Sequence, residues 1–361
     1  MKIGIIGLAQ SGKSTTFDLL QGGHAARAAV EPGKGRTGTI KVPDSRIDAL
    51  SRLFNPKKTT YSDIEFVDFA ALTSGSSRTA LAAKLLSEIK TVDGLLHVVR
   101  CFRDENVYHA EGGIDPVKDF RTLAEELHLS DLILVEQRLE KVAASVKKGS
   151  KHEAGEQHLL ERLKELLENG KRLTELTDLK AEEEGLMRSY GMVTAKPMVT
   201  VLNLDEEQFR NPAEPMTAAF REALPDQTVL RLSARVETDI SGLDSEEERK
   251  MFLEDLGMTE PGRTRLIRTC YEMLQYISFF TVGEDEVRAW TIRKGTNAQR
   301  SAGKIHTDLE KGFIRAEVVP YDDLLRLEGS LAAAKKEAVL RLEGKEYVVK
   351  DGDVLNIRFN V

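Results

Sequence analysis

The chain has 361 residues, of which 41% are hydrophobic and 31% are charged, a composition typical of a globular protein. At about 150 residues per domain, this length predicts two or three domains with a sizeable core. The net charge of −7 excludes a bulk electrostatic attraction to nucleic acid, although local basic patches could still bind RNA. The apolar runs are much shorter than the roughly 18 residues that span a bilayer. Two cysteines, Cys101 and Cys270, are too few for a disulfide framework or a zinc site, so we expect a cytoplasmic protein.

The first fifteen residues contain a phosphate-binding motif. Residues 7–14, GLAQSGKS, match the pattern G-x-x-x-x-G-K-[ST] without a mismatch. In this motif the glycines let the backbone N–H groups point at phosphate oxygens. The lysine, here Lys13, reaches the β and γ phosphates, and the hydroxyl of Ser14 coordinates Mg²⁺. The expected nucleotide contacts are Gly7, Gln10, Ser11, Gly12, Lys13, Ser14 and Thr15.

The segments on either side of the motif support this interpretation. The isoleucine-rich run at 2–6 predicts a buried strand, and the spacing of apolar residues over 14–20 predicts a helix. Strand, loop and helix follow one another as the motif requires. A glycine-rich turn in an unrelated α/β fold is the alternative, and this context makes it the weaker one.

The next strands predict a doubly wound, mainly parallel sheet. Asp68 ends the predicted strand 63–68, and it is the best candidate for a second metal contact, with a helix cap as the alternative. Further strands are expected at 95–99, 198–202 and 229–232, joined by mostly helical connections. Such a sheet binds nucleotide at its carboxyl edge. Polar groups suited to a base pocket follow two of these strands, at 203–206 and 233–235.

Several longer runs identify a family. The chain resembles the YchF type of Obg-like ATPase, a branch of the translation-factor-related P-loop GTPases, nearly from end to end. The resemblance rests on the P-loop and on the runs VPDSR (42–46), HVVRCF (97–102), NLDE (203–206), RAWTIR (288–293) and FIRAEV (313–318). It implies a nucleotide-binding G domain (1–120 and 191–275), an inserted antiparallel helical arm (121–190) and a C-terminal, β-rich, ubiquitin-like TGS domain (276–361). It also implies that nucleotide hydrolysis is linked to ribosomes.

The base-recognition run departs from the usual Asn-Lys-x-Asp of GTPases. Its fourth position is Glu206, one methylene longer than aspartate, and its second is Leu204 in place of lysine. A longer carboxylate would not fit the guanine edge unless the base shifted. The resemblance implies a preference for ATP over GTP through Asn203 and Leu204, with Ser233 and Ala234 as the second wall. A strand-end turn that caps the next helix is the alternative for this run.

The residues expected to catalyse hydrolysis also differ from the family pattern. The resemblance points to His109 as a loop histidine implicated in hydrolysis, whereas a lone loop histidine is often only a surface residue. Lys13 and Mg²⁺ would neutralise charge on the phosphates while His109 or backbone groups orient water. Ala71 stands where the family has a glycine that meets the γ phosphate, and Ala29 is the nearest counterpart of a metal-binding threonine. Thr37 or Thr39 could substitute for that threonine if the loop folds differently. These departures suggest slow or altered hydrolysis.

The middle of the chain predicts two amphipathic helices in a hairpin. Apolar residues recur at alternating three and four positions over 132–146, and a second leucine-rich helix covers 159–167. Lys147, Lys148 and Lys151 would form a basic tip that touches ribosomal RNA or protein. A solvated connector with no partner is the alternative.

The C-terminal part predicts a small β-rich module. Its expected strands cover residues 287–292, 314–319, 346–349 and 353–359. The leading hypothesis for the whole chain is an ATP-preferring, Mg²⁺-dependent hydrolase that acts as a ribosome-associated regulator. A nucleotide-binding scaffold with little turnover is the main alternative, and a small-molecule kinase is a weaker one.

Overall fold

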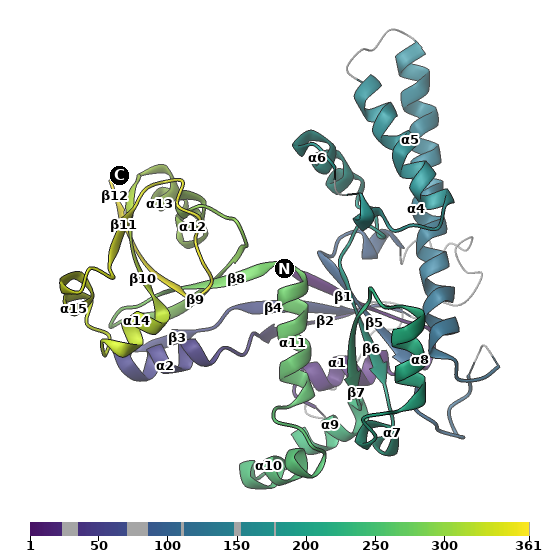
Figure 1. Cartoon of the computed structure of the whole chain (residues 1–361), viewed down its shortest axis with the longest axis horizontal. Helices are drawn as coiled ribbons and strands as arrows, with labels where there is room; N and C mark the ends of the chain where they lie inside the picture. The colour runs from purple at the N-terminus through teal and green to yellow at the C-terminus, as the bar shows by residue number, and fades with distance from the viewer. Residues whose placement is uncertain (24–34, 71–85, 110–111, 148–152, 177, 361) are drawn as a thin grey trace. The chain divides into compact units, whose positions relative to one another are not determined.

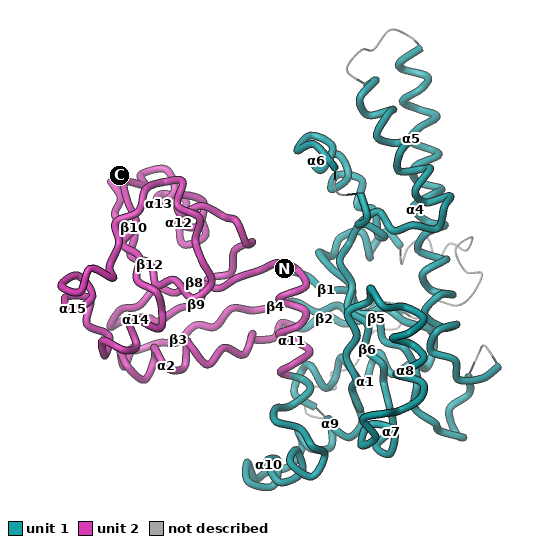
Figure 2. Tube along the Cα trace, viewed as in Figure 1, with its two compact units in different colours: residues 1–38, 65–263 teal, residues 39–64, 264–361 magenta. Residues whose placement is uncertain are grey.

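The computed structural model describes residues 1–23, 35–70, 86–109, 112–147, 153–176 and 178–360. By its internal contacts the chain forms two compact units (Figure 2). The first comprises residues 1–38 and 65–263, and the second comprises residues 39–64 and 264–361. Residues 39–64 come early in the chain yet belong to the second unit, whereas the sequence interpretation counted them with the nucleotide-binding domain. The predicted domain boundaries stay a prediction.

The first unit is built on a sheet with the strand order β2-β4-β1-β5-β6-β7. Strands β1, β4, β5, β6 and β7 pair in parallel, as predicted. The strands span β2 (Arg36–Lys41, which ends in the second unit), β4 (Asp63–Asp68, which starts in the second unit), β1 (Lys2–Ile6), β5 (Gly94–Arg100), β6 (Met198–Asn203) and β7 (Thr228–Leu232). The strand order reverses at β1, so the loop after β1 opens at the switch point where such sheets bind ligands.

Burial explains why these segments form central strands. Every residue of β5 is buried, and Ile3, Ile5 and Ile6 of β1 are at most 1% exposed. Parallel strands covered on both faces have continuous apolar runs of this kind because neither face meets water. The helices of this unit include α1 (Lys13–Leu20), α4 (Pro116–Lys147), α5 (Ala154–Glu168), η3 (Leu173–Glu175), α6 (Ala181–Tyr190), α7 (Glu206–Arg210), α8 (Pro215–Ala223), α9 (Ala234–Ser241) and α10 (Glu246–Asp255).

Helices α4 and α5 form the predicted hairpin, and Figure 1 shows them side by side. The predicted seam residues pack into one apolar cluster with the leucines of α5. Its members include Leu132, Val135, Leu139, Val142, Val146, Leu159, Leu160, Leu163 and Leu167. Helix α4 begins at Pro116, before the expected start of the arm at residue 121, because Phe120 and Leu123 also bury their side chains. Lys147 ends α4, while Lys148 and Lys151 of the predicted tip lie outside the described residues.

The second unit has a sheet with the order β11-β10-β12-β8-β9-β3. The strands span β11 (Arg341–Glu343), β10 (Phe313–Pro320), β12 (Asp353–Phe359), β8 (Tyr276–Thr281), β9 (Glu286–Arg293) and β3 (Lys58–Thr60). Its helices are α2 (Ser45–Phe54), α11 (Gly262–Met273, which starts in the first unit), α12 (Ala298–Ile305), α13 (Thr307–Lys311), α14 (Tyr321–Arg326) and α15 (Leu331–Lys336). Ile47 and Leu50 of α2 are buried against Phe280 and Val287 of the sheet.

One predicted strand is wrong. Residues 346–349 contain a tyrosine and two valines, which are typical of a strand, but they form only an isolated bridge between Val348 and Asn297. The backbone N–H of Val349 donates instead to the carbonyl of Thr296, so this segment is a connection and adds no strand to the sheet. No helix among the described residues is long and apolar enough to cross a membrane.

Candidate nucleotide site

The phosphate-binding loop links β1 to α1, and its two glycines are required by close approaches. Gly12 has φ 93° and Gly7 has φ 154°, both in the range that favours glycine. A Cβ on Gly12 would collide with the side-chain amide of Asn203, and one on Gly7 would collide with the carbonyl of Val98. The loop is therefore packed against the ends of β5 and β6, and no other residue type fits at these two positions.

Lys13 lies inside the loop. Its Nζ donates to the carbonyl oxygens of Gly7 at 3.0 Å and Leu8 at 3.1 Å. Burial lowers the pKa of Lys13 to about 8, and the charge of Asp68 partly opposes that shift. The ammonium group is thus held where the loop backbone would surround a phosphate, with few competing polar contacts.

Ser14 and Asp68, the two predicted metal ligands, are neighbours. The Ser14 hydroxyl donates to Asp68 Oδ2 at 3.1 Å, and Asp68 is 8% exposed. Among the described residues, the buried Asp68 Oδ1 has no hydrogen-bond partner. A hydroxyl and a carboxylate with a free oxygen are the hard donors that Mg²⁺ prefers, so these residues fit the ion. No cluster of three or more His, Cys, Asp or Glu ligands occurs in the described part of the chain, so phosphates and water would supply the remaining ligands.

A cavity of about 740 Å³ adjoins the loop, a volume within the usual range for small-molecule sites. Its walls come from α1 and from the segments that follow β5, β6 and β7. Six predicted nucleotide contacts line it, namely Gly12, Thr15, Asn203, Leu204, Ser233 and Glu206, which starts α7. The other predicted contacts belong to the loop itself, apart from Ala234, which begins α9.

Asn203 braces the walls of this cavity. It is 5% exposed, its Nδ2 donates to the Ser11 carbonyl at 3.1 Å, and its Oδ1 accepts from the Ala234 backbone at 3.2 Å. The side chain thereby ties the end of β6 to the phosphate loop and to α9. Ser233 Oγ is buried and has no hydrogen-bond partner among the described residues, so this hydroxyl can bond to a ligand in the cavity.

Glu206 lies at the rim. Its Oε1 accepts hydrogen bonds from Nε and Nη2 of Arg210, one helical turn along α7, at 3.1 and 3.0 Å. The carboxylate is 56% exposed and therefore well hydrated. The neighbouring Asp205 caps α7 by accepting from the backbone of Gln208. The cap foreseen as an alternative for the run 203–206 is present, and it coexists with the cavity lining.

His109 is not among the residues that line the cavity. Its Nε2 lies 3.0 Å from Oδ2 of the buried Asp119 in the first turn of α4. Arg100, at the end of β5, donates to four carbonyls of the intervening loop, those of Phe102, Asp104, Val107 and Tyr108. The loop that carries His109 is thus well anchored. The catalytic role of His109 stays a prediction.

The sequence analysis missed charged residues around the cavity. Arg103 lines it shortly after the end of β5, a position that could have suggested it. Arg235, which belongs to the predicted base-pocket run 233–235, lines it after β7. Arg36 contacts Asp68, and no pattern in the sequence pointed to it. Thr37 and Thr39, considered as substitutes for a metal-binding threonine, are exposed in β2. Ala29 and Ala71 lie outside the described residues.

Comparisons with known proteins agree with this architecture. A family model described as a 50S ribosome-binding GTPase matches residues 2–138. A model for the C-terminal domain of YchF-type GTPases, described as a protein of unknown function, matches residues 276–360. The chain is 42% identical to the ribosome-binding ATPase YchF of Bacillus subtilis, with 99% of each chain covered. It is 40% identical to the protein of that name from Escherichia coli O157:H7, covering 100% of this chain and 99% of that one.

A solved structure agrees over the same length. The YchF GTPase of Schizosaccharomyces pombe matches with a TM-score of 0.86 at 31% identity, covering 99% of this chain and 97% of that one. Together the phosphate loop, the parallel sheet, the helical hairpin and the β-rich C-terminal unit are shared from end to end. The chain belongs to the YchF family of Obg-like P-loop ATPases.

Proposed function

We propose that this protein binds ATP with Mg²⁺ at the cavity beside the phosphate loop, hydrolyses it, and uses the nucleotide state to regulate its association with the ribosome. The observation that carries the proposal is the convergence of Lys13, Ser14 and Asp68 at the phosphate loop. The flanking residues Gly12 and Thr15 line a cavity of nucleotide size. The names of the relatives, which are ribosome-binding ATPases, support the partner and the reaction.

The chain's own groups have separate roles in this proposal. Lys13 and the backbone N–H groups of the loop neutralise charge on the phosphates, and Asn203 keeps the loop in place relative to the base pocket. Ser14 and Asp68 hold Mg²⁺, which supplies charge neutralisation on the phosphate oxygens when it is bound. His109 orients water, with Asp119 fixing its ring.

The preference for ATP rests on the rim of the cavity. Leu204 is 2% exposed and offers an apolar wall, and the Glu206 carboxylate is engaged by Arg210. A carboxylate held in this way is a poor acceptor for the two N–H groups on the guanine edge. Adenine lacks that pair of N–H donors, so its binding does not depend on a hydrogen bond to this carboxylate.

Calorimetric titration with ATP and GTP, with and without Mg²⁺, tests binding, and phosphate release in the same samples tests turnover. We expect ATP to bind more tightly than GTP and phosphate to be released slowly. Lys13→Ala should weaken ATP binding by at least about tenfold, since it removes the one buried cation of the loop. Tighter binding of GTP would contradict the argument from Glu206.

A nucleotide-binding scaffold with little turnover is the second candidate. The observation that favours it is the engagement of His109 by Asp119, away from the residues that line the cavity. Tight ATP binding without phosphate release, also in the presence of ribosomes, would make this the better account.

We place the ribosome contact on the helical arm and on the β-rich C-terminal unit. Cosedimentation with ribosomes in ATP and in ADP tests the partner. Replacing Lys147, Lys148 and Lys151 by glutamate tests the arm, because reversing three charges should abolish binding to RNA phosphates. Unchanged cosedimentation of this variant would move the contact away from the arm tip.

A further inference from the structure

Arg36 at the start of β2 occupies the centre of an acidic cluster. Its Nη1 lies 2.7 Å from Asp18 Oδ1 on α1, and its Nη2 lies 2.9 Å from Asp68 Oδ2 at the end of β4. The Nε of the same side chain donates to that Asp68 oxygen at 3.2 Å. All three residues belong to the first unit of the chain.

Further contacts hold the guanidinium in this position. Its Nη2 donates to the backbone carbonyl of Ser14 at 3.2 Å, and its central carbon lies 4.6 Å from the centroid of the Phe17 ring. The Arg36 side chain is 19% exposed. A planar cation with two carboxylates, a carbonyl and an aromatic face is more strongly oriented than an ordinary surface arginine.

The oxygen that Arg36 binds is the oxygen that Ser14 binds. Asp68 Oδ2 accepts from the Ser14 hydroxyl as well as from the guanidinium, so all three groups meet at one atom. Ser14 and Asp68 are the proposed Mg²⁺ ligands. A divalent cation placed between them would stand a few ångströms from a guanidinium charge, and two such cations repel each other strongly in a partly buried site.

We propose that Arg36 is a positioning residue for the metal site. It holds Oδ2 of Asp68 beside Ser14 when no metal is bound, and it must leave that oxygen when Mg²⁺ binds between Ser14 and Asp68. The affinity for Mg²⁺ is therefore set by an exchange of cations at Asp68. This inference rests on the proposed function, because it takes Ser14 and Asp68 as the metal ligands.

The exchange predicts a direction that a purely structural ion pair does not. Removing the competing charge while keeping the carboxylate tightens Mg²⁺ binding. If Arg36 only supported Asp68 structurally, removing it would weaken Mg²⁺ binding. Lysine at position 36 keeps the charge and the competition, although it lacks the fork that contacts Asp18 and Asp68 together.

The test measures how Mg²⁺ changes the affinity for ADP, so that no turnover is needed. The full-length wild type, Arg36→Gln and Arg36→Lys are titrated with ADP by calorimetry over a series of Mg²⁺ concentrations and in excess EDTA. Arg221→Gln is the matched control, because Arg221 is an exposed arginine on α8 in the same unit.

We expect Arg36→Gln to lower the Mg²⁺ concentration at half-effect by roughly tenfold, which corresponds to about 1.4 kcal/mol. Arg36→Lys and Arg221→Gln should stay close to the wild type, and binding of ADP in EDTA should be the same in all four proteins. Arg36→Met also removes the charge and keeps an unbranched side chain beside Phe17. It should lower the half-effect concentration by a similar factor, which keeps the test informative if Arg36→Gln does not fold.

Two results would overturn the inference and are distinguishable. If the wild type depends on Mg²⁺ but Arg36→Gln or Arg36→Met binds Mg²⁺ equally or more weakly, the exchange at Asp68 is wrong and the metal site stands. If ADP binding to the wild type is independent of Mg²⁺, the proposed metal site fails and the inference fails with it.

Discussion

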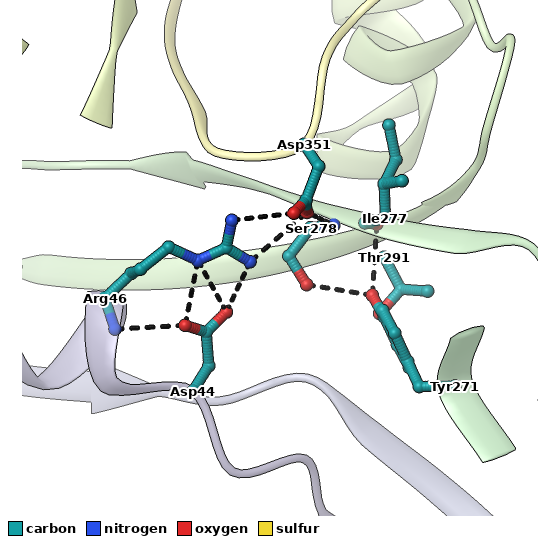
Figure 3. A network of polar contacts seen from close by, with 7 residues as sticks. All are labelled: Asp44, Arg46, Tyr271, Ile277, Ser278, Thr291 and Asp351. Carbon is teal, nitrogen blue, oxygen red and sulfur yellow. Dashed lines mark hydrogen bonds and ion pairs between the residues drawn. The ribbon is translucent and has the colours of Figure 1, made fainter. Parts of the chain in front are cut away.

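Arg46 and Asp351 stand 305 positions apart in the chain and are joined by two hydrogen bonds, of 2.8 Å from Nη1 and 3.2 Å from Nη2. Figure 3 shows the guanidinium of Arg46 between Asp351 and Asp44. Asp44 also caps α2 by accepting from the Arg46 backbone, and Asp351 accepts from the backbone of Ser278 in β8. The run VPDSR, singled out by the family resemblance, therefore joins residues 39–64 to the C-terminal part of their own unit.

Replacing Arg46 should destabilise this second unit. Arg46→Met leaves two carboxylates, Asp44 and Asp351, close together without their shared cation, and we expect the free energy of unfolding to fall by about 2–3 kcal/mol. Urea denaturation measures this loss. Arg52→Met, an exposed arginine on the same helix, is the control and should change stability by less than about 0.5 kcal/mol. Equal stability of the two variants would show that the bridge is not a support.

The brace formed by Asn203 leads to a prediction about affinity. Asn203→Ala removes the bonds to Ser11 and Ala234, so the phosphate loop and α9 lose their common anchor. We expect ATP affinity to fall by about tenfold to a hundredfold, since each buried hydrogen bond contributes about 1 kcal/mol and unpaired partners add to the loss. Calorimetry measures the change.

Thr200 on the same strand provides the matched control. It is fully buried, and its Oγ1 has no hydrogen-bond partner among the described residues. Thr200→Val should leave ATP affinity unchanged and keep or raise stability, because a buried hydroxyl without a partner is replaced by a methyl group. If both variants lost affinity equally, packing of β6 and not the Asn203 bonds would be responsible.

The buried His97 leads to a prediction of how the free energy of unfolding depends on pH. This side chain is 2% exposed in β5 and stacks on Phe120, and burial together with the charge of Lys13 lowers its pKa from 6.5 to about 3. Between these two values the unfolded chain binds a proton that the folded chain does not. The free energy of unfolding should therefore fall as the pH falls from 6.5 toward 3, by up to about 1.4 kcal/mol per pH unit from this residue.

His97→Gln should flatten this dependence. Urea denaturation at several pH values between 6.5 and 4 compares the slopes of the variant and the wild type. His158→Gln, an exposed histidine on α5, should keep the wild-type slope. A wild-type slope in His97→Gln would assign the acid sensitivity to other groups.

The contact between His109 and Asp119 predicts an effect on turnover. If His109 orients water, His109→Ala should lower phosphate release by about a hundredfold while ATP affinity stays the same, because general-base contributions have this size. Asp119→Asn should lower release by a smaller factor through the orientation of the ring. His158→Ala should release phosphate at the wild-type rate, and equal rates in all three variants would exclude His109 from the reaction.

Local patterns in the sequence were sufficient to predict much of the fold. The glycine spacing at 7–14, the apolar run of β5 and the seam of α4 and α5 each predicted an element that the structure contains. These sequence patterns are local, because the spacing of apolar residues within one strand or helix indicates which of its faces is buried. The run 346–349 shows the limit of this reasoning. Its tyrosine and valines suit a strand that finds a partner strand, and here the neighbouring chain offers only one bridge.

The sequence by itself determined the phosphate loop, the positions of the parallel strands along the chain and the helical hairpin, because residues close together in the chain decide these features. Only the tertiary structure decided which charges meet. With 52 basic and 59 acidic side chains, spacing cannot select Asp68 as the partner of Arg36 or Asp351 as the partner of Arg46. Those pairs depend on strands and loops that the folded core brings together from distant positions, and the free energy that selects them comes from burial of the core around them.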